Sequence, residues 1–551
     1  MNRFFHTTRL ALTPLTPIHI GCGEDFEPTN YVIDDGVLFH FDPARVPLAD
    51  SDRNALISAV GKRGDEAIRE LQRFFHTRKD AYAAAAHCVV GVAAGVSEQY
   101  ARRIGSVAQH ESGGRRVANQ LEIERCAHHP HNGTPYIPGS SIKGAIRTAW
   151  LDQLNDGRSK LPDERSAQDI EKRLLNSRAG FHADPFRLVR IGDAAGPELQ
   201  SRVVFSTNHK KRLVHDRDGR VVLARGPSTR REVIEPGQFR ALSTELSLHA
   251  LPGVRANDRV PGEAERISDF STLALACNRY YLKRLDALLE LLDARRFAAP
   301  DWIEHTRKLF SHLRPRLQAG ELMLLRVGRH SGAESVTLDG IRSIRIMTGR
   351  NQPPEWSPEG AKTVWLAAER EDDRSGMLPF GWLLAELADT PPDPSVEGWC
   401  ADQPRTDLAA IRARLADARH RATEEAERLR RIAAERQAHE LAEAARHAER
   451  EAALASMRAE GKLIAEFVEA CEARQRSNRK DPCNPGAGIY GRASALAKVA
   501  LADGGGWSPD DRVALAQALS EWLPRVVDKL DRKDDWKDAR KRLKLAVLLG
   551  Q

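Results

Sequence analysis

The stretch PYIPGSSIKGAIRTAW, residues 135–150, decides how the chain is interpreted, because it joins an extended segment to a helix. Pro138-Gly139 predicts a tight turn, and Ser140 or Ser141 can cap the helix that follows. The first backbone N–H groups of a helix have no partner within it and attract negative charge. The stretch therefore predicts an anion-binding helix start.

The predicted helix has two chemically different faces. Lys143 and Arg147 lie four residues apart on one face. The other face is an apolar stripe of Ile142, Ile146, Ala149 and Trp150. Lys143 is followed by Gly144 and not by the hydroxyl residue of a nucleotide-binding P-loop, so ATP hydrolysis is not supported. Taken alone, the pattern also fits a capped surface helix with two solvated bases.

Four further segments accompany this stretch: TPIHIGCG (16–23), RIGDA (190–194), LRVGRHSG (325–332) and MLPFGW (377–382). Together with residues 135–149 they resemble, in order, the signature blocks of RAMP-superfamily proteins of type III CRISPR effector complexes. Within that superfamily the chain is most similar to the subunit that caps the crRNA 3′-end side of the type III-A (Csm) complex. The resemblance extends from residue 1 to about residue 385.

The resemblance implies an α+β fold with a ferredoxin-like (RRM-like) RAMP core in one or two copies. It also implies a non-catalytic subunit that helps define the mature crRNA 3′ end, with crRNA, target RNA and other RAMP subunits as partners. Residues of the helix and of the Gly-rich loop would contact the crRNA or shape that contact: Gly139, Ser140, Ser141, Lys143, Gly144, Arg147, Gly328, Arg329, His330, Ser331 and Gly332.

A strongly basic segment, Phe205 to Arg231, carries eight Lys or Arg residues and includes Lys210, Lys211 and Arg212. DRDG, residues 216–219, is a typical turn sequence, so we predict a basic β-hairpin that reaches RNA or a partner subunit. A solvated loop is the alternative.

Other candidates for chemistry are weaker. CAHHPH, residues 126–131, has adjacent histidines whose spacing does not suit zinc, so we expect a polar loop and neither a metal nor another cofactor. His19 and His330 are the best acid–base candidates for a second reading, a crRNA-processing endoribonuclease. Asp193 is expected to fix a turn and not to bind Mg²⁺.

The 551 residues exceed one domain, and the net charge is +7. Seven scattered cysteines without a C-x-x-C motif favour a reducing cytoplasm. The N-terminus does not have the pattern of a signal peptide. The longest apolar run, residues 83–96, is too short to span a bilayer, so we expect a buried element and no membrane association.

Composition predicts four regions: a RAMP-type body (1–388), a Pro-rich linker (389–405), a long helix or helical hairpin (406–460) and a small helical domain (461–551). Lys533, Lys537 and Arg540 follow one another at helical steps beside Trp536. A third reading is therefore a structural adaptor whose tail recruits a nuclease or a small helical subunit.

Overall fold

A computed structural model describes most of the chain and divides it into two compact units, Met1–Ala426 and Glu427–Gln551. The described residues are 5–46, 48–63, 65–105, 109–110, 116–117, 121–130, 133–178, 180–215, 218, 221–222, 226, 228–250, 260–261, 267–347, 352–502 and 506–551.

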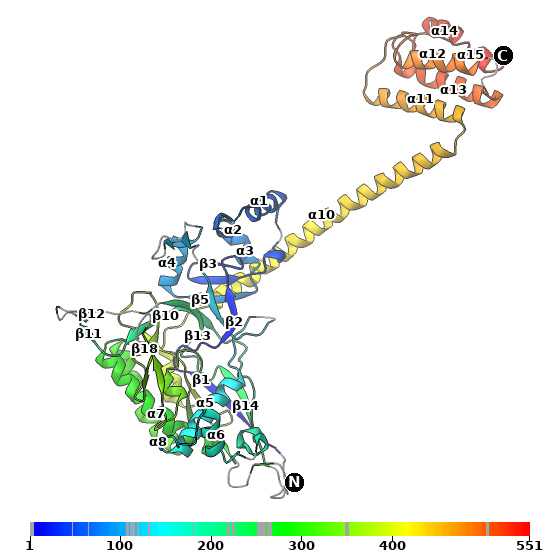
Figure 1. Cartoon of the computed structure of the whole chain (residues 1–551). Coiled ribbons are helices and arrows are strands. Elements are labelled where there is room, and N and C mark those ends of the chain that lie inside the picture. Colours follow the sequence, from blue (N-terminus) through cyan, green and yellow to red (C-terminus); the bar gives the residue numbers. More distant parts are fainter. Residues whose placement is uncertain are drawn as a thin grey trace. The chain divides into compact units, whose positions relative to one another are not determined.

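The first unit contains a five-stranded antiparallel sheet in the order β15-β20-β1-β14-β9. Two of its paired strands, β1 and β14, are labelled in Figure 1. Its strands are β1 (Phe5–Pro14), β9 (Val189–Ile191), β14 (Leu242–His249), β15 (Leu322–Arg326) and β20 (Trp382–Leu387). Helix α5 (Gly139–Asn155) lies between β1 and β9 in the sequence, and helix α7 (Phe270–Ala294) lies between β14 and β15. With β15 set aside as an added edge strand, the order β20-β1-β14-β9 and the positions of α5 and α7 reproduce the β-α-β-β-α-β ferredoxin-like arrangement. The ferredoxin-like core is confirmed, in one copy in this sheet.

Sequence patterns explain these elements. β14 alternates buried and less buried residues, whereas all five residues of β15 are buried. Helix α5 buries its predicted stripe of Ile142, Ile146 and Ala149. It packs against α7, where the Tyr281 hydroxyl donates to the Ala145 carbonyl oxygen at 3.1 Å.

A second, nine-stranded sheet has the order β2-β8-β13-β10-β5-β4-β3, with β18 and β19 attached through β10. Its strands are β2 (Gly21–Phe26), β3 (Tyr31–Asp34), β4 (Val37–His40), β5 (Cys88–Val92), β8 (Ile123–Cys126), β10 (Ser201–Lys210), β13 (Thr229–Ile234), β18 (Thr363–Ala368) and β19 (Leu378–Pro379). Pairs β10–β5 and β13–β8 are parallel, so this sheet does not repeat the antiparallel pattern of the first. One hydrophobic core joins both sheets, as shown by Leu12, Val90 and Val203 in the same cluster.

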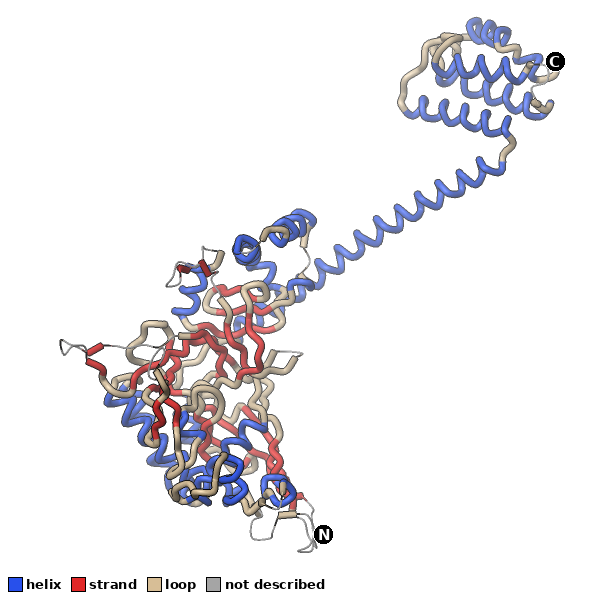
Figure 2. The backbone as a smooth tube through the Cα atoms, in the orientation of Figure 1, coloured by secondary structure: helices blue, strands red, loops and turns tan. Residues whose placement is uncertain are grey.

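Further helices and short strand pairs complete the first unit, and Figure 2 distinguishes its helices from its strands by colour. The helices are α1 (Asp50–Val60), α2 (Asp65–Thr77), α3 (Lys79–Ala84), α4 (Ala94–Arg103), α6 (Ala167–Leu174) and α8 (Pro300–Gln318). The short strands pair as β6 (Gln109–His110) with β7 (Arg116–Val117), β11 (Val214–His215) with β12 (Val221–Val222), and β16 (Ile344–Ile346) with β17 (Glu355–Ser357).

The segment predicted as a linker, residues 389–405, is part of the body. It contains helix α9 (Pro394–Ala401), which packs against α8. Val396, Trp399 and Cys400 belong to the main hydrophobic core. The prolines that suggested a linker start this helix instead, with Asp393 as its N-cap and Pro394 in its first turn.

Residues 409–456 form one continuous helix, α10 (Ala409–Ser456), and not a hairpin. The second unit adds α11 (Ala459–Arg476), α12 (Gly488–Ala500), α13 (Pro509–Val526), α14 (Lys533–Arg542) and α15 (Leu545–Leu548) around their own hydrophobic core. Ser508 caps α13 as the sequence predicts, in a capping box with Asp511. None of the described helices combines the length and the apolar character that crossing a membrane requires.

Candidate nucleic-acid interface

Three of the five signature segments meet beside the ends of β1, β15 and β20. The Val327 amide donates to the Gly381 carbonyl at 2.8 Å, and the Gly381 amide donates to the Pro17 carbonyl at 2.9 Å. The Arg329 amide then donates to the His19 carbonyl at 2.8 Å. Segments 16–23, 325–332 and 377–382 therefore form one backbone-bonded cluster.

The other two segments join each other and lie close to this cluster. Ile137 and Ala194 exchange two backbone hydrogen bonds of 2.8 and 2.9 Å. Ala127 connects the two groups, because its amide donates to the Ile20 carbonyl at 2.7 Å and its carbonyl accepts the Tyr136 amide at 2.9 Å. The structure thus brings together all five segments on which the resemblance rests.

The start of α5 differs from the prediction. The helix begins at Gly139, preceded by Pro138, and neither Ser140 nor Ser141 caps it. The carboxylate of Asp193 takes that role from segment 190–194, accepting the Gly139 amide at 2.8 Å. A side chain at Gly139 would overlap the Ile191 and Gly192 carbonyl oxygens, which explains the glycine. One N–H of the predicted anion site is therefore already occupied, and Asp193 fixes local structure as expected.

Lys143 and Arg147 are used within the body. The Lys143 ammonium donates to the Val189 carbonyl oxygen at 2.8 Å, and burial lowers the pKa of Lys143. The Arg147 guanidinium bonds to Glu171 at 2.8 Å and to Asp184 at 2.9 Å. The prediction that both cations face an open phosphate site does not match this geometry. Of the two roles considered, shaping the site fits better than contacting RNA. Ser140 and Gly144 are the exposed members of this helix start.

The Gly-rich loop turns most of its side chains inward. Gly328 has φ +80°, and a Cβ there would overlap the His19 carbonyl oxygen, so the position requires glycine. His330 stacks on Trp365 with ring centroids 4.3 Å apart, and Ser331 is buried. Gly332 also has a positive φ, of 82°. Arg329 is the loop side chain most available to a ligand, with 58% of its side chain exposed.

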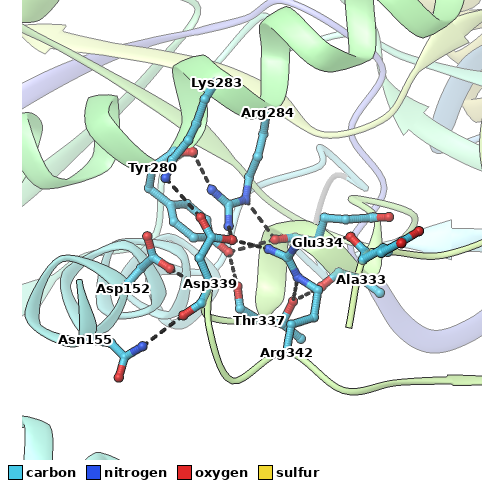
Figure 3. Close-up of polar contacts among 12 residues, drawn as sticks. Asp152, Asn155, Tyr280, Lys283, Arg284, Ala333, Glu334, Thr337, Asp339 and Arg342 are labelled. Carbon is cyan, nitrogen blue, oxygen red and sulfur yellow. Dashed lines mark hydrogen bonds and ion pairs between the residues drawn. The ribbon is translucent and has the colours of Figure 1, made fainter. Parts of the chain in front are cut away.

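A polar network anchors the segment that follows the loop, residues 333–342 (Figure 3). The Asp339 carboxylate accepts from Lys283 at 2.9 Å, from Arg284 at 2.8 Å and from Arg342. Burial alone would raise the pKa of Asp339, but these three cations outweigh burial and hold it below its usual value. The Asp339 amide donates to Asp152 of α5 at 2.7 Å. The network therefore fixes the loop's continuation to α5 and α7.

Glu124 on β8 is a charged hub that the sequence analysis missed. Its carboxylate pairs with Arg231 and with Arg329 at 3.0 Å, and it lies 3.9 Å from the His19 Nε2 atom. These partners come from segments far apart in the sequence, so no local motif marks them. The hub ties the exposed Arg329 to the second sheet.

His19 and His330 do not form an accessible acid–base pair. Burial lowers the pKa of His19 to about 4, assisted by the nearby cations Arg231 and Arg329. Burial also lowers the pKa of His330 to about 3. The Nε2 atoms of both rings are buried. Both rings thus combine a lowered pKa with a buried Nε2 atom, which does not favour the endoribonuclease reading.

An open basic surface lies at the end of β10. It is a depression of about 550 Å³ lined by Lys210, Lys211, Arg212, Glu334, Ser357, Glu359, Gly360, Ala361 and Lys362. Lys210 is exposed, and the Arg212 side chain is 94% exposed, with Glu359 at 3.9 Å. Lys211 is tied to Glu334 at 2.6 Å. Lys362 was missed by sequence reasoning; it reaches this surface because β18 pairs with β10.

The basic hairpin is present in part. β11 and β12 pair through Val214 with Val222, as predicted. Asp216, Arg217 and Gly219 of the turn, together with Arg220 and Arg225, lie outside the described residues. Arg231 points into the body, with only 2% of its side chain exposed, and Arg230 donates to Gln99 at 2.7 Å. The eight bases are thus not one continuous surface.

The side chains of the CAHHPH segment, residues 126–131, point in different directions where the structure describes them. Cys126 is buried and its thiol lies 3.1 Å from the Glu232 carbonyl oxygen. His129 stacks on Tyr136 at 4.9 Å between ring centroids, while the His128 Nδ1 atom lies 2.9 Å from the Cys126 carbonyl oxygen. His131 lies outside the described residues. The described members of the motif, Cys126, His128 and His129, therefore do not point to one common position.

The chain is similar to known proteins in sequence and in structure. Residues 11–297 match the model of the RAMP superfamily. The chain is 27% identical over 214 residues to a Methanocaldococcus jannaschii protein described as "CRISPR system Cms protein Csm5", covering 36% of this chain and 46% of the relative. The chain thus spans about half the length of this curated relative.

Two solved structures are also similar over 69% of this chain. One is a chain of a Csm-crRNA-target RNA ternary complex of a type III-A CRISPR-Cas system, with 20% identity, a TM-score of 0.36 and all of that chain covered. The other is the crystal structure of T. onnurineus Csm5, with 16% identity, a TM-score of 0.38 and 99% of that chain covered.

Proposed function

Because the chain belongs to the RAMP superfamily, we propose that it is a non-catalytic crRNA-binding subunit of a type III-A CRISPR interference complex. The observation that carries the proposal is the match of residues 11–297 to that superfamily. The convergence of all five signature segments and the name of the curated relative support it. In this proposal the partners are crRNA, target RNA and other RAMP subunits, in the cytoplasm.

The RNA backbone would lie along two exposed basic places on the body. One is Arg329 with the exposed start of α5, and the other is the depression around Lys210, Arg212 and Lys362. Lys and Arg that neutralise phosphates supply the sequence-independent part of RNA affinity. Lys143, Arg147 and the inward residues of the Gly-rich loop would hold these places in shape.

We further propose that the subunit caps the crRNA 3′-end side of the complex and helps define the mature 3′ end. The curated relative carries the name of a Csm subunit, which supports this assignment. The lowered pKa values and the buried Nε2 atoms of His19 and His330 support a role without cleavage. The second unit, with its own core, is a suitable docking module for a nuclease or a small helical subunit.

The test is to assemble the complex with and without this chain and to measure the lengths of the bound crRNA. With the chain, we expect crRNA of defined 3′ length; without it, the 3′ ends should become heterogeneous or shift. Identical 3′ ends in both assemblies would contradict the capping role.

The isolated chain should bind single-stranded RNA and leave it intact, with or without divalent metal. A homogeneous product that disappears in His19→Ala or His330→Ala would favour the endoribonuclease reading instead. This outcome is separable from the capping test, because it needs no other subunit.

A further inference from the structure

Three metal-binding side chains converge at the open edge of the second sheet. Cys22 and Glu24 lie two residues apart on the edge strand β2, and His128 follows its neighbour β8. One ligand atom from each lies within 4.8 Å of the other two. The pairing of β2 with β8 shifts register between Gly21 and Asp25, and such bulges re-aim side chains. In the part of the chain that the structure describes, this is the one group of its kind.

The His128 ring is held in the orientation that a metal ligand needs. Its Nδ1 atom lies 2.9 Å from the Cys126 carbonyl oxygen, so Nδ1–H donates there and the lone pair is on Nε2. Ligand histidines in metal sites are commonly fixed by a carbonyl in this way. Only 11% of the His128 side chain is exposed, which limits its motion.

The His128 Nε2 atom faces the Glu24 carboxylate at 3.6 Å. A lone pair and a carboxylate oxygen repel each other unless a proton or a cation lies between them. The Cys22 Sγ atom lies 4.0 Å from the His128 Nδ1 atom and 3.8 Å from the Arg125 carbonyl oxygen. It can supply a soft ligand when its exposed side chain turns towards Nε2. Arg125 holds Glu24 in place, with its Nη1 atom 3.7 Å from Glu24 and its guanidinium over the Phe26 ring.

We propose that Cys22, Glu24 and His128 form a three-ligand site for a divalent transition metal of the zinc class. Thiolate, imidazole and carboxylate are the ligands that zinc takes, and three protein ligands leave a fourth position for water. Metal–sulfur and metal–nitrogen bonds of about 2.3 and 2.0 Å bring ligand atoms to about 3.5 Å from one another. Cys22 and Glu24 are exposed, so rotation of their side chains closes the remaining distance.

The test uses the full-length, metal-free chain without a polyhistidine tag, titrated with Co²⁺ as a spectroscopic substitute for Zn²⁺. We expect one equivalent to bind, with a thiolate–cobalt charge-transfer band in the near ultraviolet and the strong visible bands of a four-coordinate ion. Zn²⁺ should displace it. Cys22→Ser should abolish the near-ultraviolet band, and His128→Ala should weaken binding at least about tenfold.

Cys483→Ser is the matched control, because Cys483 is another exposed thiol outside the cluster. It should leave the band and the affinity unchanged. Circular dichroism and the thermal midpoint of each variant establish that it is folded, and Zn²⁺ should raise the midpoint of the wild-type chain but not of Cys22→Ser. The proposal is overturned if the folded wild-type chain binds no Co²⁺ saturably or if the band survives Cys22→Ser. In the first case the three side chains are neighbours that hold no shared ion.

Discussion

At the scale of single residues, Gly328 is a position where backbone geometry constrains the candidate interface. Gly328→Ala places an L-residue at positive φ and drives its Cβ into the His19 carbonyl oxygen. We expect the free energy of unfolding to fall by about 2 kcal/mol or more. Chemical denaturation of both proteins measures the difference.

Gly144→Ala is the control for that substitution. Gly144 is helical and exposed, with no heavy atom within 4 Å of an added Cβ. Alanine should therefore stabilise the protein by up to about 1 kcal/mol through helix propensity. Equal effects at both positions would mean that the Gly328 turn is not formed as described.

His19 should make stability depend on pH. Its pKa is about 4 in the folded protein, below the ordinary value of 6.5, so between those values the unfolded chain binds a proton that the folded chain does not. Stability should fall as the pH drops from about 6.5 towards 4. His19→Gln should reduce that slope by about 1.4 kcal/mol per pH unit, the equivalent of one proton. Unfolding curves at several pH values test this, and an unchanged slope would place His19 in contact with solvent.

Lys143 and Arg147 show where sequence reasoning at this scale reaches its limit. Their spacing correctly predicted a shared face of α5. Of the predicted apolar stripe, Ile142, Ile146 and Ala149 are buried, and Trp150 is half-buried against the same core. The partners of that face, Val189, Glu171 and Asp184, come from later segments. No pattern within the helix could have revealed that its cations were already paired.

At the scale of elements, the Asp339 network should determine whether segment 333–342 stays attached to α5 and α7. Asp339→Asn removes the charge that balances Arg284 and Arg342, whose side chains are only 9% and 13% exposed. We expect a loss of about 2–4 kcal/mol in unfolding free energy, because unpaired buried cations are costly. Asp286→Asn is the control: it removes a carboxylate whose pair with Arg314 is about half exposed, and should cost less than about 1 kcal/mol. Similar losses of unfolding free energy in both variants would contradict the role of Asp339 in attaching segment 333–342 to α5 and α7.

Elements with strong local patterns were predictable from the sequence. The helix expected after Pro138-Gly139 corresponds to α5, and the region expected to be a long helix or a helical hairpin, residues 406–460, contains α10. The nine-stranded sheet was not foreseen as a unit, because its neighbouring strands include the parallel pairs β10–β5 and β13–β8. Such pairings depend on long-range contacts that leave no local signal. The predicted set of basic residues around the depression was incomplete for the same reason, because Lys362 reaches the depression only through the pairing of β18 with β10.

At the scale of the whole molecule, the division into two units predicts where the chain can be cut. A chain ending at residue 426 should keep the body folded, because Leu408 and Leu415 at the start of α10 are buried and lie within it. A chain ending at residue 388 loses Val396, Trp399 and Cys400 from the main core. We expect the shorter form to be much less stable, because each lost large apolar side chain costs about 2–5 kcal/mol. Thermal unfolding compares the two, and equal midpoints would restore the view of residues 389–405 as a linker.

The central claim is that the exposed basic surface of the body binds RNA through its phosphates. The most direct measurement is the salt dependence of single-stranded RNA binding by the triple variant Lys210→Ala, Arg212→Ala and Lys362→Ala. The control removes the same charge from exposed positions of α10, through Arg430→Ala, Arg431→Ala and Arg436→Ala. Each lost phosphate contact should flatten the log–log slope by about 0.7, so the first variant should lose up to about 2 units while the control keeps the wild-type slope. Equal slopes in wild type and the Lys210 variant, at equal fold stability, would contradict the account.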